Sequence, residues 1–410
     1  MDFPSASKIR MIQYMAKQSP MLVPTAEIAQ RSDFRQCTAS VLDTRDDPGM
    51  RFDDDGICHY YHEYQQQSAK HIPEPDKLES ALAAKVDEMN RDGKGSDYDC
   101  LVGVSGGVDS TYVALLAKRL GLRPLCVHLD NGWNSELAVQ NIHSIVEKLD
   151  LDLFTYVIDW EEFRDIQLAF IKASVVDIEL VTDHAIFATL YLQAGKHGIK
   201  HILSGTNVMT ETTLPPHWIH HKTDHVNIKA IHKQFGKIPM KTYPLMDWKV
   251  KKYYQMHKGL ESFSILNYVP YNKAKVKAEI IEELGWRDYG GKHYESIFTR
   301  FYQGYILPTK FGIDKRKAHL SDLIFAGQIT KEEAIAELAE PIYDAEQARV
   351  DREFVLKKLG LSESEFEAIL NTPPKSHYDY PTEGALLEMY PILKPLRLPI
   401  QLFKKLIKKR

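Results

Sequence analysis

The pattern of hydrophobic and polar positions changes near residue 99. Before it, residues 1–95 are irregular apart from a stretch of helical spacing at 75–89, and the polar run at 92–98 is typical of a linker. From there on, short apolar runs at 100–104, 124–129, 153–158 and 200–204 alternate with segments of helical spacing. This alternation predicts a parallel sheet with helices on both faces.

Beyond about residue 250 the strand pattern fades, and helical spacing dominates at 272–285, 315–340, 343–359 and 362–371. The chain is therefore expected to have an α/β fold built on a doubly wound parallel sheet. Its predicted parts are an N-terminal extension (1–95), the sheet domain (96–260) and a helical C-terminal domain (261–410).

Composition and charge narrow the class of protein. The chain has 410 residues, of which 44% are hydrophobic and 26% charged, the balance of an ordinary globular protein. A net charge of −4 argues against a nucleic-acid partner. No apolar run approaches the ~20 residues of a membrane helix, and residues 1–20 lack the apolar core of a signal peptide. Four cysteines fit a reducing compartment, so we expect a cytoplasmic protein without a transmembrane segment.

The hexapeptide Ser105-Gly-Gly-Val-Asp-Ser110 lies directly between a predicted strand and a predicted helix. Gly106 and Gly107 allow a sharp turn close to a ligand, and the following helix start is an anion site. The hydroxyls of Ser105 and Ser110 add donors, and Asp109 is placed to hold Mg²⁺ that bridges phosphates. No lysine follows, so this is not the loop of P-loop NTPases. The alternative is a glycine-rich turn in which Asp109 only starts the helix.

This hexapeptide resembles the PP-loop of the ATP-pyrophosphatase (adenine nucleotide α-hydrolase-like) superfamily. The resemblance implies an enzyme that cleaves ATP between the α- and β-phosphates and passes AMP to a substrate oxygen. ATP and Mg²⁺ are the cofactors that it implies.

Further stretches resemble one branch of that superfamily, the N-acetyl sugar amidotransferases of bacterial surface-polysaccharide synthesis. They are the C-T-x-x-V-x-D-T start at Cys37, the segment 52–58, Tyr98-Asp-Cys100, the segment 129–135 and the segment 222–236. The branch implies an AMP- and PPi-forming amidotransferase (a carbon–nitrogen ligase) that adenylates an N-acetylated or uronic, nucleotide-linked sugar and transfers ammonia to it. The alternatives are another PP-loop enzyme, such as an amide ligase or a tRNA-modifying enzyme, and a non-catalytic nucleotide-binding scaffold.

The source of ammonia is expected to lie outside this chain. A class II glutaminase needs an N-terminal cysteine, whereas residue 2 is Asp2. A class I glutaminase needs a cysteine in a Gly-rich nucleophile elbow, and none of the four cysteines lies in one. We expect a separate glutaminase subunit with an ammonia-channel partner, or free ammonia.

Polar residues at two other strand ends are further candidates, because ligands of parallel sheets bind there. Asp130 follows the second strand and is predicted to contact the nucleotide, with an ordinary Asn-Gly turn as the alternative. Gly205 and Thr206 follow the later strand, and the resemblance to the superfamily implies that this loop closes over the nucleotide and brings a second acid to Mg²⁺. Glu211 is the candidate second Mg²⁺ ligand, against a plain solvated acid.

The histidine-rich segment 215–225 has two interpretations. The favoured one is an acceptor loop in which Trp218, His221 and Lys222 contact the sugar and the diphosphate. The alternative is metal binding, which zinc-ligand spacing does not favour.

The candidates for stabilising charge on the transferring phosphate are Arg300, Lys315 and Arg316, because a cation near that group lowers the barrier. The alternative is that these residues only pack the C-terminal helices.

Relatives in the branch often carry two cysteine pairs spaced for a Zn²⁺ knuckle, whereas here only Cys37 and Cys58 are present. Ser40 and Tyr61 occupy the other two positions and are poor zinc ligands, so zinc is not expected. The alternative is a zinc site that uses Cys37, Cys58, His59 and His62. The basic amphipathic tail at 396–410 could lie on an anionic membrane surface as a weak peripheral contact, with a solvated helix as the alternative.

Overall fold

The computed structural model describes residues 34–291 and 294–384. Its centre is a five-stranded, all-parallel sheet in the order β3-β2-β1-β4-β5. The strands are β1 (Cys100–Gly103), β2 (Pro124–Asp130), β3 (Asp152–Val157), β4 (His201–Ser204) and β5 (Glu261–Ser264). The predicted α/β fold with a parallel sheet is confirmed.

The helices occupy the connections and most of the C-terminal region. They are α3 (His59–His71), α4 (Leu78–Asp92), α5 (Val108–Arg119), α6 (Glu136–Leu149), α7 (Trp160–Ala173), α8 (Leu180–Lys196), α9 (Val208–Glu211), α10 (His225–Phe235), α11 (Trp248–His257), α12 (Lys273–Leu284), α13 (Ile297–Phe301), the π-helical segment η4 (Tyr302–Phe311), α14 (Arg316–Phe325), α15 (Lys331–Ala339), α16 (Ala345–Leu359) and α17 (Glu363–Asn371). Short 3₁₀ turns are Pro75–Lys77, Pro216–Trp218, Ile265–Tyr268 and His377–Asp379. None of the helices in the described ranges is both long and apolar enough to cross a membrane.

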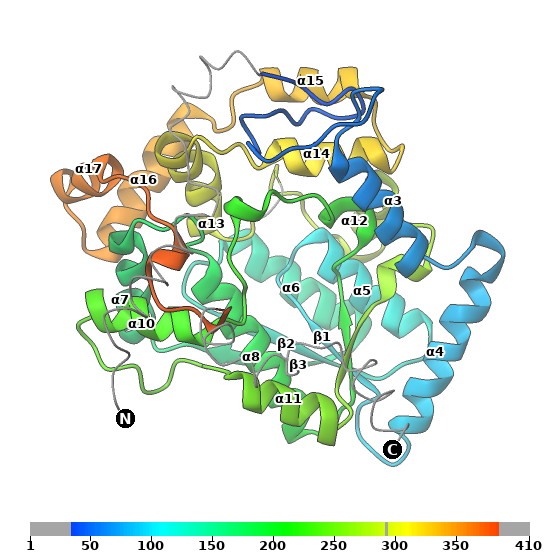
Figure 1. Cartoon of the computed structure of the whole chain (residues 1–410). Coiled ribbons are helices and arrows are strands. Elements are labelled where there is room, and N and C mark those ends of the chain that lie inside the picture. Colours follow the sequence, from blue (N-terminus) through cyan, green and yellow to red (C-terminus); the bar gives the residue numbers. More distant parts are fainter. Residues whose placement is uncertain (1–33, 292–293, 385–410) are drawn as a thin grey trace, which may run out of the picture.

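The first three residues of strand β1 are buried because helices cover both faces of the sheet (Figure 1). Its alternate residues point to opposite sides. Val102 packs in a core with residues of α5, α6 and α12, while Leu101 packs in a second core with Ala188 and Tyr191 of α8. The chain thus forms the doubly wound arrangement that the alternating pattern predicts.

The strand order creates a switch point beside β1. From β1 the chain proceeds to β2 and then β3 on one side, and it returns to place β4 and β5 on the other side. Register confirms this central position, since Val102 is paired with Cys126 of β2 and with Leu203 of β4. In open parallel sheets a crevice at the carboxyl ends of such strands is the usual ligand site.

Three of the differences from the predictions have a clear physical reason. The sequence pattern missed α3, because only Tyr60 and Tyr64 of its polar sequence are buried. It also missed β5, a four-residue strand that follows the predicted domain boundary at residue 260 and pairs with β4. The single helix predicted at 315–340 is two helices, since Gly327 adopts φ +66° and Thr330 caps α15.

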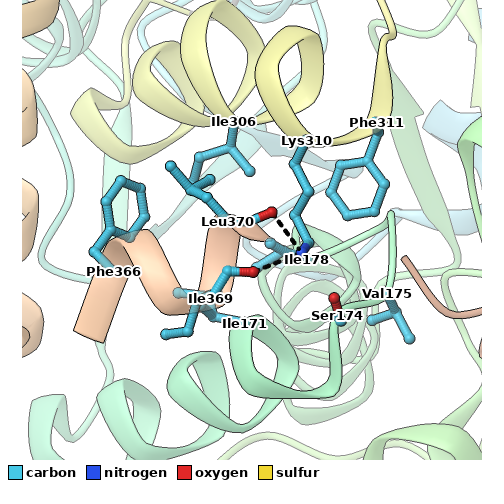
Figure 2. A pocket seen from close by; sticks show the side chains of 10 residues that line it. All are labelled: Ile171, Ser174, Val175, Ile178, Ile306, Lys310, Phe311, Phe366, Ile369 and Leu370. Atoms are coloured by element: carbon cyan, nitrogen blue, oxygen red, sulfur yellow. Dashed lines mark hydrogen bonds between the residues drawn. The ribbon is translucent and has the colours of Figure 1, made fainter. Parts of the chain in front are cut away.

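The C-terminal helices pack against α7 and α10 around a third core. Figure 2 shows Lys310 of η4 pointing at the end of α17, where its ammonium donates to the carbonyl oxygens of Ile369 (2.6 Å) and Leu370 (3.3 Å). The adjoining apolar cavity measures about 10 Å³, the lower limit for one water. It is therefore a packing defect closed by a helix-capping lysine, and not a ligand site.

The N-terminal extension lies against α14 and α15, far from it in sequence (Figure 1). Asp43, whose side chain is fully buried, accepts from Arg45 and from Lys317 Nζ at 2.8 Å. These two cations hold the pKa of Asp43 at about 2, against the effect of burial, which alone would raise it. The predicted extension is thus tied to the C-terminal helices by a buried ion pair.

Candidate functional site

The loop Ser105–Ser110 joins the central strand β1 to α5, as its pattern predicts. It is called the phosphate loop below, after its predicted role. Gly106 adopts φ +81°, and a Cβ there would lie 2.7 Å from the carbonyl oxygen of Ala138. Only glycine fits this position, because it tolerates a positive φ and leaves room for the neighbouring backbone. Gly107 is the N-cap of α5 and has no side chain that could cap the first turn of this twelve-residue helix. That end of α5 favours an anion.

Two serine hydroxyls line the same turn. Ser105 Oγ lies 3.2 Å from Ser110 Oγ and accepts from the Gly107 N–H at 3.2 Å. Ser110 Oγ in turn donates to the Gly107 carbonyl at 3.2 Å. The predicted phosphate-binding residues are therefore brought together in one compact loop by hydrogen bonds among themselves.

The loop after β4 contacts the loop after β1 across the switch point. A Cβ at Gly205 would lie 3.2 Å from the Cβ of Asp109, so this glycine permits the close approach of the two loops. Thr206 Oγ1 bonds to Ser204 Oγ (2.9 Å) and to Ser264 Oγ (3.0 Å), which ties the loop to β4 and β5. The structure thus places the predicted residues Gly205 and Thr206 beside the phosphate loop.

The charges of Asp109 and Glu211 both affect the buried hydroxyl of Tyr271. The Tyr271 hydroxyl donates to Asp109 Oδ1. Burial raises the pKa of Tyr271, and the charges of Asp109 and Glu211 raise it further, so the phenol stays protonated as a donor. The two predicted acids therefore both lie close enough to Tyr271 to raise its pKa.

These acids fit a magnesium ion that phosphates also hold. Mg²⁺ is usually bound through one or two carboxylates plus substrate phosphates and waters. No group of three or more His, Cys, Asp or Glu side chains arranged for a metal occurs within residues 34–291 and 294–384. A pair of carboxylates beside the phosphate loop matches coordination that is shared with phosphates and waters, and not a closed site built from protein ligands alone.

At the end of β2, Asp130 holds its own turn. Its Oδ1 accepts from the Gly132 N–H (2.8 Å) and from Asn134 Nδ2 (3.3 Å). His128 links this turn to the phosphate loop, since its Nδ1 lies 2.8 Å from the Val104 carbonyl oxygen and its Nε2 lies 2.9 Å from Asn134 Nδ2. Burial lowers the pKa of His128, which favours a neutral ring. A nucleotide contact by Asp130 stays a prediction.

Several residues that cover the phosphate loop or the turn after β2 were not predicted from the sequence. Trp286 Nε1 donates to the Gly106 carbonyl at 2.8 Å. A Cβ at Gly107 would lie 3.3 Å from the Tyr289 hydroxyl and 3.6 Å from Glu295 Oε1. Lys358 of α16 donates to the Gly132 carbonyl and lies over the rings of Trp133 and Trp160. No local signal marks these residues, because each comes from an element that is distant in sequence from the turn that it contacts.

The predicted acceptor residues have structural partners. Trp218 is only 2% exposed and belongs to the core, so its ring offers no open face. Lys222 Nζ lies 2.8 Å from Asp177 Oδ2 and 2.9 Å from Asp183 Oδ2. Burial lowers the pKa of Lys222, but the charges of these two acids outweigh it and raise that pKa overall. His221 is exposed. A sugar contact by any of the three stays a prediction.

The three predicted cations are also held by partners. Arg300 makes two hydrogen bonds to the buried Asp351, at 2.6 and 2.8 Å. Arg316 binds Asp314 and the carbonyl oxygens that end α15. Lys315 lies 3.6 Å from Glu179, at the start of α8. A catalytic role for each of the three stays a prediction.

Cys37 and Cys58 come together in the N-terminal extension, both fully buried. The Cys58 N–H donates to Cys37 Sγ at 3.2 Å, and Ser40 Oγ lies 3.9 Å from Cys58 Sγ. The hydrogen bond from the Cys58 thiol contributes most to lowering the pKa of Cys37 to about 5. The positions that resemble a zinc knuckle are thus adjacent in space as well. The basic tail at 396–410 lies outside the described residues.

The C-terminal region of the chain is similar to a known protein family. Residues 295–394 match the family model described as "LPS biosynthesis protein WbpG-like, C-terminal domain". The chain is 24% identical over 282 residues to "Uncharacterized protein MJ1599" of Methanocaldococcus jannaschii, which covers 66% of this chain and 83% of that protein.

Two solved structures are similar to this chain. One is an NH3-dependent NAD synthetase from Campylobacter jejuni (TM-score 0.27, 19% identity, covering 50% of this chain and 83% of that one). The other is an NMN synthetase from Francisella tularensis (TM-score 0.29, 15% identity, covering 71% and 98%). From the start of α13 onward, the chain is therefore similar to the C-terminal domain of an LPS biosynthesis protein.

Proposed function

We propose that this protein is an ATP-dependent amidotransferase that adenylates an oxygen of a sugar nucleotide and replaces the resulting AMP with ammonia. The observation that carries the proposal is the loop Ser105–Ser110, which presents an uncapped helix end and two serine hydroxyls at the switch point of a parallel sheet. Such a site favours the pyrophosphate part of ATP.

The chain's residues divide into those that hold pyrophosphate and those that organise charge. The backbone of Gly106 and Gly107 and the hydroxyls of Ser105 and Ser110 would hold the β- and γ-phosphates. Asp109, fixed by the Tyr271 hydroxyl, and Glu211 would hold Mg²⁺, which when bound neutralises charge on the phosphates.

The reaction itself would proceed in two displacements. An acceptor oxygen attacks the α-phosphorus, the bond to the β-phosphate oxygen breaks, and pyrophosphate leaves into the loop that is built for it. Ammonia then attacks the activated carbon and AMP departs with the oxygen. Adenylation thus converts a poor leaving oxygen into a good one. Binding that grows stronger as pyrophosphate separates accelerates the first displacement.

The match of residues 295–394 supports a sugar acceptor, because the matched family is described as an LPS biosynthesis protein. The acceptor oxygen would belong to an acetamido or a carboxylate group. All four cysteines are buried, which supports an ammonia supply from a separate glutaminase subunit or from solution.

The products of ATP cleavage test the proposal. The full-length chain is incubated with ATP, Mg²⁺, ammonium and a panel of nucleotide-linked N-acetylated and uronic sugars, and the nucleotide products are separated. We expect AMP and pyrophosphate in equal amounts, dependent on one class of sugar. Asp109→Asn should lower this rate by about 10²-fold or more, the loss typical of removing one transition-state contact. A matched control is Glu353→Gln, since the Glu353 side chain is 80% exposed.

Three outcomes would contradict the proposal. ADP and phosphate as products would indicate a different cleavage position. A near-normal rate in Asp109→Asn would mean that the loop acts only as a turn. Cleavage to AMP that depends on RNA and not on a sugar would favour the tRNA-modifying alternative.

A further inference from the structure

A pocket of about 480 Å³ opens between α10 and the segment that follows it. Lys229, His232 and Lys233 line it from one face of α10, and Lys241 lines it from the following segment. Met240, Tyr243 and Leu245 complete the lining with apolar and aromatic surface. The volume lies within the roughly 300–1,000 Å³ of small-molecule sites, and the lining combines apolar surface with a few charged groups as such sites do.

The lysines that line this pocket have no carboxylate partners among the described residues. Lys229, Lys233 and Lys241 are exposed, and none forms an ion pair with a carboxylate of the described ranges. The surrounding stretch, residues 225–258, contains eight lysines and one aspartate in a chain whose net charge is −4. Net charge alone therefore concealed a local concentration of positive charge.

The nearest acids on α7 are engaged by other groups. Glu162 accepts from the backbone N–H groups of Thr242 and Tyr243, and Asp165 accepts from those of Lys237 and Ile238. His232 Nε2 also lies 3.1 Å from Asp165 Oδ2. These carboxylates hold the segment 237–243 in place, so the three lysines are left to face a ligand.

The pocket lies at the same edge of the sheet as the phosphate loop. The Tyr156 hydroxyl, near the end of β3, donates to the Thr242 carbonyl at 2.9 Å. The Tyr243 hydroxyl donates to the Val181 carbonyl in the first turn of α8, at 2.6 Å. Next to Val181, Thr182 Oγ1 accepts from Asn131 Nδ2 at 3.5 Å, directly after β2. A chain of contacts thus runs from the pocket to the strand ends beside the phosphate loop.

We propose that this pocket binds the diphosphate group of the sugar-nucleotide acceptor. Three unpaired ammonium groups provide charge-assisted hydrogen bonds for a diphosphate, and the aromatic and apolar wall accommodates an uncharged part of the same molecule. A sugar held there would extend along the carboxyl edge toward the phosphate loop. This assignment of the ligand rests on the proposed function, whereas the anion site itself does not.

Calorimetric titration tests the assignment without turnover. The full-length protein is first saturated with α,β-methylene ATP and Mg²⁺, so that the phosphate loop is filled. It is then titrated with UDP-N-acetylglucosamine, UDP-glucuronate or inorganic pyrophosphate. We expect saturable binding of at least one sugar nucleotide, with pyrophosphate binding at least tenfold more weakly.

Variants locate the binding. The double variant Lys229→Gln/Lys233→Gln should bind the sugar nucleotide about tenfold or more weakly than the wild type. The double variant Lys229→Arg/Lys233→Arg should retain most of the affinity. The matched control is Lys249→Gln/Lys258→Gln, which removes equal charge from exposed positions of the same basic stretch outside the pocket. Its affinity should stay within about twofold of the wild type. Thermal melting should give similar transitions for all variants, because these side chains are exposed.

Other outcomes overturn the proposal. Equal losses in the pocket and control variants would mean diffuse attraction of any anion. Unchanged affinity in Lys229→Gln/Lys233→Gln, no binding of either sugar nucleotide, or pyrophosphate binding as tightly as the sugar nucleotide would each refute it. The proposed function can fail separately. If ATP is never cleaved to AMP but the pocket variant alone loses binding, the pocket stands and the reaction does not.

Discussion

The hydroxyl of Tyr271 donates a hydrogen bond to Oδ1 of Asp109, which joins the residues before α12 to the first turn of α5. Tyr271 is only 4% exposed, so this contact is shielded from water. It fixes one oxygen of the carboxylate that we propose as a magnesium ligand.

Replacing Tyr271 with phenylalanine should therefore misplace Asp109 without unfolding the protein. We expect pyrophosphate release to fall about tenfold to 10²-fold, the cost of a small displacement of a catalytic group, and half-saturation to require more Mg²⁺. Rates measured across a Mg²⁺ titration test this. Tyr253→Phe is the control, because that side chain is 48% exposed. A Tyr271→Phe enzyme with normal rate and normal Mg²⁺ dependence would separate Tyr271 from the site.

Gly106→Ala should destabilise the protein more than Gly121→Ala. Both glycines have positive φ, +81° and +74°, so each alanine costs about 1 kcal/mol in backbone strain. At Gly106 the added Cβ also meets the Ala138 carbonyl oxygen at 2.7 Å, whereas nothing lies within 4 Å at Gly121. Overpacking adds about 1–3 kcal/mol. Urea unfolding of both variants measures the difference, and equal losses would show that the loop relaxes freely.

Substitutions at Arg300 can distinguish a catalytic role of this residue from a purely structural one. Its two hydrogen bonds to Asp351 join α13 to α16, and the side chains are 14% and 4% exposed. If the pair is structural, Arg300→Ala should cost about 3–5 kcal/mol, because it leaves a buried charge without its partner. The double variant Arg300→Met/Asp351→Leu should recover much of that loss. Activity per folded molecule should stay near normal in the double variant, and loss of that activity would favour the catalytic role.

The surroundings of His201 predict how its contribution to the free energy of unfolding depends on pH. Its ring lies between Asp92 (Nε2 to Oδ2, 2.9 Å) and Glu261 (Nδ1 to Oε1, 3.2 Å), which joins β4 to α4 and β5. Burial alone would lower the pKa of His201, but these two carboxylates outweigh it and raise the pKa. A raised folded-state pKa means that the folded state binds the proton more tightly than the unfolded state does.

The stabilisation from His201 should therefore be complete below the ordinary histidine pKa and should disappear as pH rises through the folded-state pKa. We expect His201→Gln to lower the free energy of unfolding by about 1.5–3 kcal/mol at pH 5.5, the range for hydrogen bonds to charged groups, and by less at pH 8.5. Urea unfolding of both proteins across this range gives the difference. A difference that grows with pH would have the wrong sign for a charged His201.

The phosphate loop could be predicted because its determinants are close together in sequence. A buried strand, two glycines, two serines and a helix start occupy residues 100–119, and their geometry depends on local backbone preferences. The strand at 261–264 could not be predicted, because its polar sequence becomes a strand only by pairing with β4. The partners of Arg300 and Lys222 were equally hidden, since an ion pair depends on which helices meet.

The sequence by itself determined the alternation of strands and helices and the loop between β1 and α5, because periodicity and turn residues act over a few neighbours. Only the tertiary structure decided which side chains surround that loop. Tyr271, Trp286, Tyr289 and Glu295 reach it from beyond β5. It also buried Trp218 in the core and placed Lys229 and Lys233 of α10 in the lining of a pocket, where neither forms an ion pair with an acid of residues 34–291 and 294–384. Exposure and pairing depend on contacts between distant elements, which the order of residues along the chain does not specify.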